Sequence, residues 1–337
     1  MSATPELTQP WRIGPVEIPN RVVLAPLAGI GNWVVRLQAK RHGAGLAVSE
    51  MVSSHAVHHR NRRTHAELLR IHPDERAAGP VSVQLFGADP DVMRSAAATV
   101  ARAGADLIDL NMGCPVPKVC KTGAGVALLS DPRRAVAVAR AAREGSGLPV
   151  TVKLRAGRRP GEREGVEVAR RLVEDAGVAG IAFHPRSAAV RHKGVPDYEL
   201  AAELVATLPV PVLISGGLHE AERVRAVFEA TGAAAVMLAR GSLGNPWLFE
   251  ELLGRRDGAP GPDEVLDELA WFVDRVEEHL GAERAASWLR KAYPWYVERL
   301  GLEPARRARE CQAAFQQART LTEQRALAAA LRVHQPA

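Results

Sequence analysis

The chain has 337 residues, of which 47% are hydrophobic and 24% are charged. This composition excludes a disordered chain, and the length suffices for one large core with a smaller second unit. Three cysteines cannot form a disulfide framework, and no run of about 18 apolar residues could span a membrane, so we expect a cytoplasmic protein. A net charge of +6 is only a weak indication of an anionic partner.

Short apolar runs alternate with helix-forming stretches from residue 21 to about 241. Near-continuous apolar runs predict strands buried on both faces, so the pattern predicts a (β/α)8 TIM barrel. A doubly wound open sheet is the alternative, but no G-x-G-x-x-G turn follows the first strand. Asp89 and Asp131 are predicted helix N-caps. The expected strands are 22–27, 46–51, 81–86, 107–111, 150–154, 180–184, 210–215 and 234–239, and the expected helices include 90–103, 131–144, 164–176 and 220–230.

The composition changes at residues 254–262, which are rich in glycine and proline and predict a linker. Beyond it, apolar residues recur at helical spacing in four stretches, and no strand-like run is present. We therefore expect a catalytic barrel in residues 1–250 and a small C-terminal helical bundle in residues 251–337. The four helical stretches are 263–280, 282–300, 305–318 and 322–333.

Polar residues and glycines end most of the predicted strands, where a TIM barrel carries its reactive groups. Gly216 and Gly217 follow the seventh strand, and Ala239 and Arg240 follow the eighth. Glycine lets backbone N–H groups approach a phosphate, and arginine adds a fork of donors. These turns therefore predict a phosphate site, and tight turns without a ligand are the alternative.

Three further strand ends could face a planar cofactor. Lys153 could stabilise negative charge on a cofactor ring, Gln84 could bind a ring edge through its amide, and His184 could contact the ring or the substrate. Each could equally be a hydrogen-bonded core residue. Cys114, at the mouth of the fourth strand, is favoured as a nucleophile or a proton donor. Cys120 follows too far along the chain for close zinc-ligand spacing, so we expect no metal site.

These motifs together resemble the tRNA-dihydrouridine synthase family, whose flavin-dependent bacterial members reduce uridines in tRNA. The resemblance extends over residues 12 to 250, and the helical tail agrees with the family's tRNA-binding domain. The motifs are APLAG at 25–29, VQL at 83–85, DLNMGCP at 109–115, KVCKTGAG at 118–125, VKLR at 152–155, HPRS at 184–187 and GSLGNPWLF at 241–249.

The resemblance implies a mechanism. FMN is reduced by NADPH or NADH, hydride passes from flavin N5 to C6 of uracil, and Cys114 protonates C5 as general acid. The implied substrate-binding residues are Asn111 and Arg186. The implied FMN-binding residues are Pro26, Ala28, Gln84, Lys153, His184, Gly216, Gly217, Ala239 and Arg240. The expected state is a monomer with no obligate protein partner.

Three residues depart from the family pattern, namely His192, Ala292 and Pro294, and they leave open which uridine is reduced. We expect Pro294 to kink its helix. Two competing functions also remain open at this point, namely an FMN barrel acting on a free pyrimidine and a non-catalytic RNA-binding barrel.

Basic side chains gather in places that could contact tRNA. Residues 284–337 carry ten basic and four acidic side chains, whereas residues 255–283 carry three and nine. Arg155 and Arg159 extend a second cluster around Arg158. A solvated helix face is the alternative for such runs. The predicted phosphate contacts are Arg60, Arg62, Arg63, Arg158, Arg290, Lys291, Arg306 and Arg307.

Overall fold

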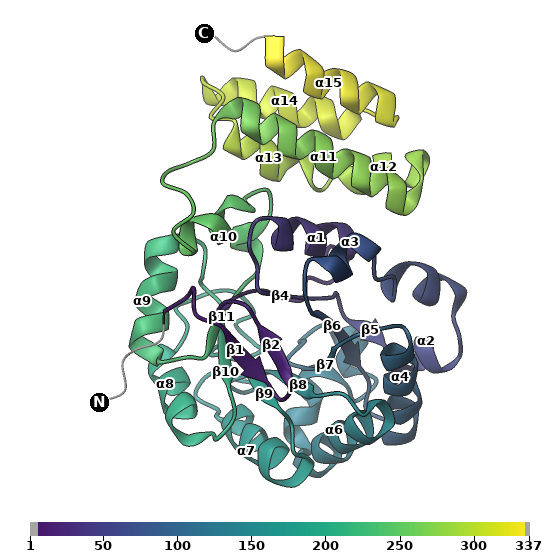
Figure 1. The fold of residues 1–337 in the computed structure, drawn as a ribbon, viewed down its shortest axis with the longest axis vertical. Helices are drawn as coiled ribbons and strands as arrows, with labels where there is room; N and C mark the ends of the chain where they lie inside the picture. The colour runs from purple at the N-terminus through teal and green to yellow at the C-terminus, as the bar shows by residue number, and fades with distance from the viewer. Residues whose placement is uncertain (1–5, 334–337) are drawn as a thin grey trace. The chain divides into compact units, whose positions relative to one another are not determined.

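The computed structural model describes residues 6–333. They divide into two compact units, and the division along the chain falls between Arg240 and Gly241. The predicted boundary at residue 250 falls within α10 (Trp247–Leu252), inside the second unit. Figure 1 shows the elements of both units, which are described separately below.

The first unit is a closed barrel of parallel strands. The sheet order runs from β4 through β3 and β11 to β6, and β4 also pairs with β6, which closes the ring. The predicted (β/α)8 barrel is confirmed, and the open-sheet alternative is wrong. The strands are β3 (Val22–Leu24), β4 (Leu46–Val48), β6 (Val81–Phe86), β7 (Leu107–Met112), β8 (Val150–Arg155), β9 (Gly180–His184), β10 (Val212–Ser215) and β11 (Ala235–Leu238), with β5 (Val52–Ser53) as a short extension on β6.

Helices surround this barrel (Figure 1). The Asp89 side chain accepts hydrogen bonds from the N–H groups of Asp91 and Val92, and Asp131 accepts from Arg134 N–H, so both predicted N-caps are confirmed. The helices are α1 (Trp33–Arg41), α2 (Ser54–His58), α3 (Pro73–Ala77), α4 (Pro90–Arg102), α5 (Pro117–Cys120), α6 (Pro132–Ser146), α7 (Glu164–Ala176), α8 (Tyr198–Thr207) and α9 (Ala221–Thr231).

An antiparallel hairpin that the sequence patterns did not predict, β1 (Trp11–Ile13) and β2 (Val16–Ile18), precedes the barrel. Its buried side chains cluster with Leu46, Leu107 and Leu213, which lie at or near the first residues of their strands. The hairpin therefore closes the amino end of the barrel. The carboxyl end is left for the chemistry.

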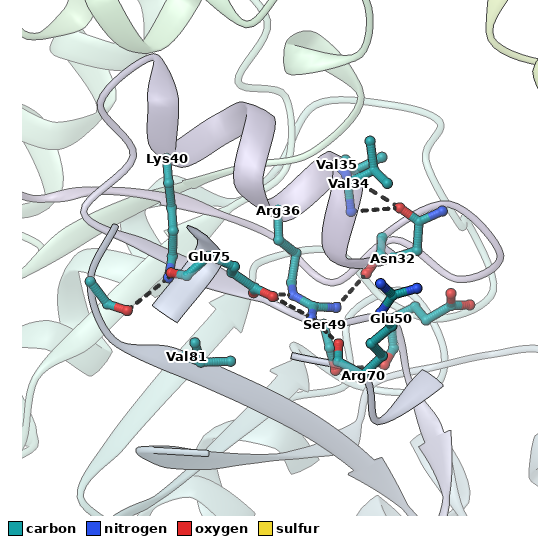
Figure 2. A network of polar contacts seen from close by, with 12 residues as sticks. Asn32, Val34, Val35, Arg36, Lys40, Ser49, Glu50, Arg70, Glu75 and Val81 are labelled. Carbon is teal, nitrogen blue, oxygen red and sulfur yellow. Dashed lines mark hydrogen bonds and ion pairs between the residues drawn. The ribbon is translucent and has the colours of Figure 1, made fainter. Parts of the chain in front are cut away.

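Figure 2 shows a buried polar network that joins α1 to α3. Arg36 Nε and Nη2 donate to the two carboxylate oxygens of Glu75 at 2.5 and 2.9 Å, and both side chains are at most 1% exposed. Arg36 also donates to the carbonyl oxygens of Gly31 and Arg70, each at 3.1 Å. Gly31 O accepts a further bond from Glu50 N–H. The network therefore fixes the loop between β3 and α1.

Glu75→Ala should lower the free energy of unfolding by about 3–5 kcal/mol, because the buried Arg36 guanidinium would lose its counter-charge. Urea denaturation followed by circular dichroism measures the change. Glu17→Ala is the matched control, since Glu17 forms an exposed ion pair with Arg12 and its loss should leave stability nearly unchanged. Equal small effects of both substitutions would show that the buried pair contributes no stability.

The second unit is helical. Tyr293 stacks on Phe315 with ring centroids 4.0 Å apart, and Phe272 packs against Tyr296. Gln324 is fully buried and accepts a hydrogen bond from Tyr293 Oη. The helices that follow α10 are α11 (Pro262–Leu280), α12 (Ala282–Leu289), α13 (Tyr293–Arg299), α14 (Ala305–Gln317) and α15 (Leu321–Val333).

Pro294 lies in the first turn of α13, where its missing N–H has no intrahelical partner to lose. The stretch predicted as one kinked helix over 282–300 is therefore two helices, with a break at residues 290–292. Within residues 6–333, no helix has both the length and the apolar composition to cross a bilayer.

Candidate active site

A cavity of about 690 Å³ is formed at the carboxyl ends of the barrel strands, and no carboxylate is among its described lining residues. Lysine and arginine side chains contribute the charge, so the cavity suits an anionic occupant. It brings together all twelve residues that the sequence assigned to catalysis, substrate or cofactor. These are Pro26, Ala28, Gln84, Asn111, Cys114, Lys153, His184, Arg186, Gly216, Gly217, Ala239 and Arg240.

Two glycines after β10 shape one side of the cavity. Gly216 and Gly217 have φ angles of +102° and +76°, in the region that disfavours other residues. A Cβ on Gly216 would lie 2.4 Å from His184 Nε2, and one on Gly217 would lie 2.8 Å from Tyr198 Oη. The turn therefore requires glycine at both positions, because His184 and Tyr198 occupy the space that a side chain would need.

His184 is held as a neutral imidazole. Burial lowers its pKa far below the usual range, and the nearby charges of Lys153, Arg155 and Arg186 lower the pKa further. Arg186 Nη1 lies 3.2 Å from His184 Nε2. Since a guanidinium can only donate, Nε2 is the acceptor and Nδ1 carries the proton. His184 therefore acts through hydrogen bonding rather than through charge.

Lys153 is a largely desolvated cation that lines the cavity. Burial lowers its pKa to about 8, with a smaller lowering effect from Arg155 and an opposing effect from Asp109. Its Nζ donates to Ser215 Oγ at 3.0 Å. A lysine that carries a desolvation cost of this kind is typical of a functional position.

The Cys114 loop is held at several points. The Cys114 N–H donates to Asn111 Oδ1 at 2.9 Å, and the Cys114 carbonyl accepts from Val126 N–H at 3.0 Å. Arg155 Nε donates to Gly113 O at 3.1 Å, which braces the preceding residue. Cys120 Sγ donates to the Cys114 carbonyl at 3.4 Å. The thiol of Cys114 is therefore presented by a fixed backbone.

Two buried residues below the cavity, Asp109 and its partner Thr151, were missed by the sequence analysis. Asp109 is 1% exposed and accepts hydrogen bonds from Thr151 Oγ1 at 2.7 Å and from Gln84 Nε2 at 2.5 Å. Burial raises the pKa of Asp109 to about 6, against the lowering effect of these two bonds and of Lys153. A carboxylate inside an otherwise apolar strand was the signal that could have identified it.

The structure changes the interpretation of one arginine cluster. Arg155 is 5% exposed and donates to the carbonyl oxygens of Gly113, Ser187 and Arg191, so it is an internal brace and not part of an RNA-facing cluster. Arg158 is exposed but donates through Nε and Nη2 to Glu164 Oε1. Its charge is therefore partly neutralised.

The remaining predicted RNA contacts lie in two places. Arg60, Arg62 and Arg63 are exposed; Arg60 lies in the turn after α2, and Arg62 and Arg63 lie in the helical segment that follows. Arg60 also lines a groove of about 540 Å³ whose other polar or titratable lining residues are His58, His65, Ser95, Thr99 and Arg102. In the second unit, Lys291 Nζ lies 4.3 Å from the centre of the Trp288 ring, and Arg306 pairs with Glu310 at 3.2 Å. Arg290 and Arg307 belong to this unit as well.

A closed (β/α)8 barrel with a cation-rich cavity and a cysteine at its carboxyl end is typical of a barrel enzyme, and the cavity suits an anionic ligand. The sequence matches the dihydrouridine synthase (Dus) family over residues 23–334. The chain therefore belongs to the dihydrouridine synthase family.

Similar proteins agree with this membership. The chain is 36% identical over 294 residues to tRNA-dihydrouridine synthase B of Pseudomonas aeruginosa, covering 86% of this chain and 87% of that protein. It is 34% identical over 330 residues to tRNA-dihydrouridine synthase B of Shewanella oneidensis, covering 94% and 96%. The solved structure of morphinone reductase has a TM-score of 0.58 at 17% identity, covering 79% of this chain and 94% of that one, which shows a shared fold.

Proposed function

We propose that this protein is an FMN-dependent tRNA-dihydrouridine synthase that reduces the C5–C6 double bond of uridine in tRNA, with NADPH or NADH as the reductant. The observation that carries the proposal is the convergence of a fixed Cys114, the buried Lys153 and the glycine turn after β10 on one cavity. Membership of the dihydrouridine synthase family supports the reaction. We further propose that the enzyme acts as a monomer in the cytoplasm.

The residues of the cavity fit FMN. Gly216 and Gly217 line the cavity, where the backbone N–H groups of their turn would hold a phosphate, and Arg240 supplies further donors. Pro26, Ala28 and other apolar side chains offer a surface for a flat ring, and Ala239 leaves room near the phosphate turn. Lys153 and Gln84 would hold the polar edge of the ring, and His184 would donate or accept through a neutral imidazole.

In the proposed mechanism, FMN supplies the hydride that goes to C6 of the uracil. The thiol of Cys114 delivers the proton to C5, so the group must remain protonated until it is used. Three of the five N–H donors of Arg186 are used on Gly194 O and His184, which leaves two for the substrate. Asn111 keeps the Cys114 backbone in place while it lines the uracil site.

A uridine within folded tRNA must leave its stack to enter this cavity. We propose that exposed basic residues hold the RNA backbone during this step. In the barrel these are Arg60, Arg62 and Arg63, with Arg158 as a weaker contributor because of Glu164. In the helical unit they are Arg290, Lys291, Arg306 and Arg307, and this unit is the proposed tRNA-binding domain.

The triple substitution R60A/R62A/R63A should weaken tRNA binding and reduce the slope of log Kd against log salt by about 2, since each lost phosphate contact contributes about 0.7–0.9. Filter binding at several salt concentrations gives this slope. A matched triple substitution, R140A/R171A/R225A, removes three exposed arginines from outer helices of the barrel. An unchanged slope in the first variant, or equal slopes in both, would contradict the assignment.

The function is tested with the full-length protein, FMN, NADPH or NADH, and an unmodified tRNA transcript. Mass spectrometry of digested tRNA should reveal uridines that have gained two hydrogen atoms. Reduction of free pyrimidines without any reduction of tRNA would favour the alternative function, an FMN barrel that acts on a free pyrimidine. A protein that binds tRNA but takes up no FMN would favour the non-catalytic alternative. Fragment mapping of the product identifies the reduced position.

A further inference from the structure

Asp109 determines the orientation of a neighbouring amide that faces the cavity. It lies on β7, below the lining residues, and its Oδ2 accepts from Gln84 Nε2 at 2.5 Å. A carboxylate offers only acceptors, so the NH2 end of Gln84 must face it. Gln84 Oε1 therefore points the other way, where it accepts from Asn111 Nδ2 at 2.9 Å.

Asn111 extends the series of hydrogen bonds from Gln84 to the Cys114 loop, with its NH2 toward Gln84 and its oxygen toward the loop. Since its Nδ2 is used on Gln84, its Oδ1 faces the backbone and accepts from the N–H groups of Cys114 at 2.9 Å and Gly113 at 3.3 Å. A backbone N–H can only donate. The series thus begins at an obligatory acceptor, Asp109, and ends at obligatory donors. Only one orientation of the two amides satisfies both ends.

We infer that Asp109 is a positioning residue for the reductase site. It fixes the orientation of the Gln84 amide and, through Asn111, the position of the Cys114 backbone. The catalytic meaning of the inference rests on the proposed function, because it concerns the residues proposed to hold FMN and to deliver the proton. The alternative is that Asp109 is a buried polar group whose loss affects only stability.

Asn111→Asp distinguishes the two, because a carboxylate at this position cannot donate to Gln84 Oε1, which Asp109 holds toward it. If Asp109 fixes the Gln84 amide, the two acceptors repel each other; if it does not, the amide turns and the contact is restored. We expect the Cys114 loop to lose its anchor and the site for the FMN ring edge to lose its arrangement. Asp109→Asn alone should have little effect, because its amide can keep its oxygen toward Gln84 Nε2 and donate to Thr151 Oγ1, a hydroxyl that accepts as well as donates.

The main readout uses the apoprotein and requires no turnover. Iodoacetamide labelling of Cys114 is followed by mass spectrometry, since tryptic cleavage after Lys118 separates Cys114 from Cys120. The rate constant should rise about tenfold in Asn111→Asp, the scale of one hydrogen bond to a charged partner. The Kd for FMN should rise by a similar factor, measured by flavin fluorescence.

A compensating change at the other end provides the decisive test. In D109N/N111D, the amide introduced on β7 donates to Gln84 Oε1, Gln84 Nε2 donates to the new carboxylate, and that carboxylate accepts the Cys114 N–H. The double variant should return to within about twofold of the wild-type rate, so Asp109→Asn, which has little effect alone, should suppress the effect of Asn111→Asp.

Two controls separate positioning from stability. Asp106→Asn makes the same chemical change as Asp109→Asn three residues earlier, where the carboxylate accepts from Val81 N–H, and it should not suppress the effect of Asn111→Asp. Thr151→Val removes a partner of Asp109 without reversing Gln84, so the Cys114 rate should stay near wild type. A wild-type rate in Asn111→Asp, or a double variant that is labelled as fast as Asn111→Asp, would overturn the inference. Absence of dihydrouridine formation by the wild-type enzyme would instead refute the proposed function.

Discussion

Cys114→Ala should slow tRNA reduction by about 10²–10⁴-fold, the usual contribution of a positioned general acid. Flavin reduction by NADPH should remain at the wild-type rate, because Cys114 is assigned only to the proton that goes to C5. tRNA affinity should change little, since the thiol is small and the basic residues that would hold the backbone are untouched. Rapid mixing of the reduced enzyme with tRNA under single-turnover conditions measures the affected step.

Cys120→Ala is the matched control for this prediction. Cys120 also carries a free thiol near the loop, but it donates to the Cys114 carbonyl and does not line the cavity. Burial raises its pKa, so it is less available as a thiolate. Its removal should reduce the single-turnover rate by no more than a few-fold. Full activity in Cys114→Ala would mean that another group or a water molecule supplies the proton.

The barrel strands were predictable because each is buried on both faces and is therefore apolar along its length. Val22–Leu24 and Ala235–Leu238 show this plainly. The hairpin of β1 and β2 was missed because two strands of three residues are too short to show a period. The break between α12 and α13 was also missed, since the apolar spacing continues across it while Pro294 begins a new helix.

The candidate site was predictable to the level of which residues meet, because strand ends in a barrel converge by topology. The hydrogen-bond partners of each polar side chain were not predictable. Arg155 reads as a surface cation in the sequence, yet its guanidinium donates to three carbonyl oxygens. Asp109 is apparent only in three dimensions, because its importance comes from the direction of the Gln84 amide. Spacing along the chain carries no information about amide orientation.

Lys153→Met should raise the Kd for FMN by about 10–100-fold, which corresponds to losing a hydrogen bond from a charged group. The reduction potential of bound FMN should fall, because a cation beside the ring favours the more negative reduced form. Flavin fluorescence titration and a dye-coupled redox titration measure the two quantities. Lys40→Met is the matched control: burial also lowers the pKa of Lys40 to about 8, but its Nζ donates to Glu75 O and Gly79 O, away from the cavity. That control should reduce stability and leave FMN affinity unchanged.

The pH dependence of apoprotein stability separates a cofactor role for Lys153 from a structural one. The pKa is about 8 in the folded protein against an ordinary value of 10.5, so the unfolded state binds more protons between these values. Stability therefore rises with pH across that window, and below it the folded protein bears the cost of a buried ammonium group. Lys153→Met should flatten this rise and should not destabilise the apoprotein near neutral pH. A large loss of apoprotein stability with unchanged FMN affinity would instead make Lys153 the structural partner of Asp109, and the cavity would lose its proposed contact to the ring edge.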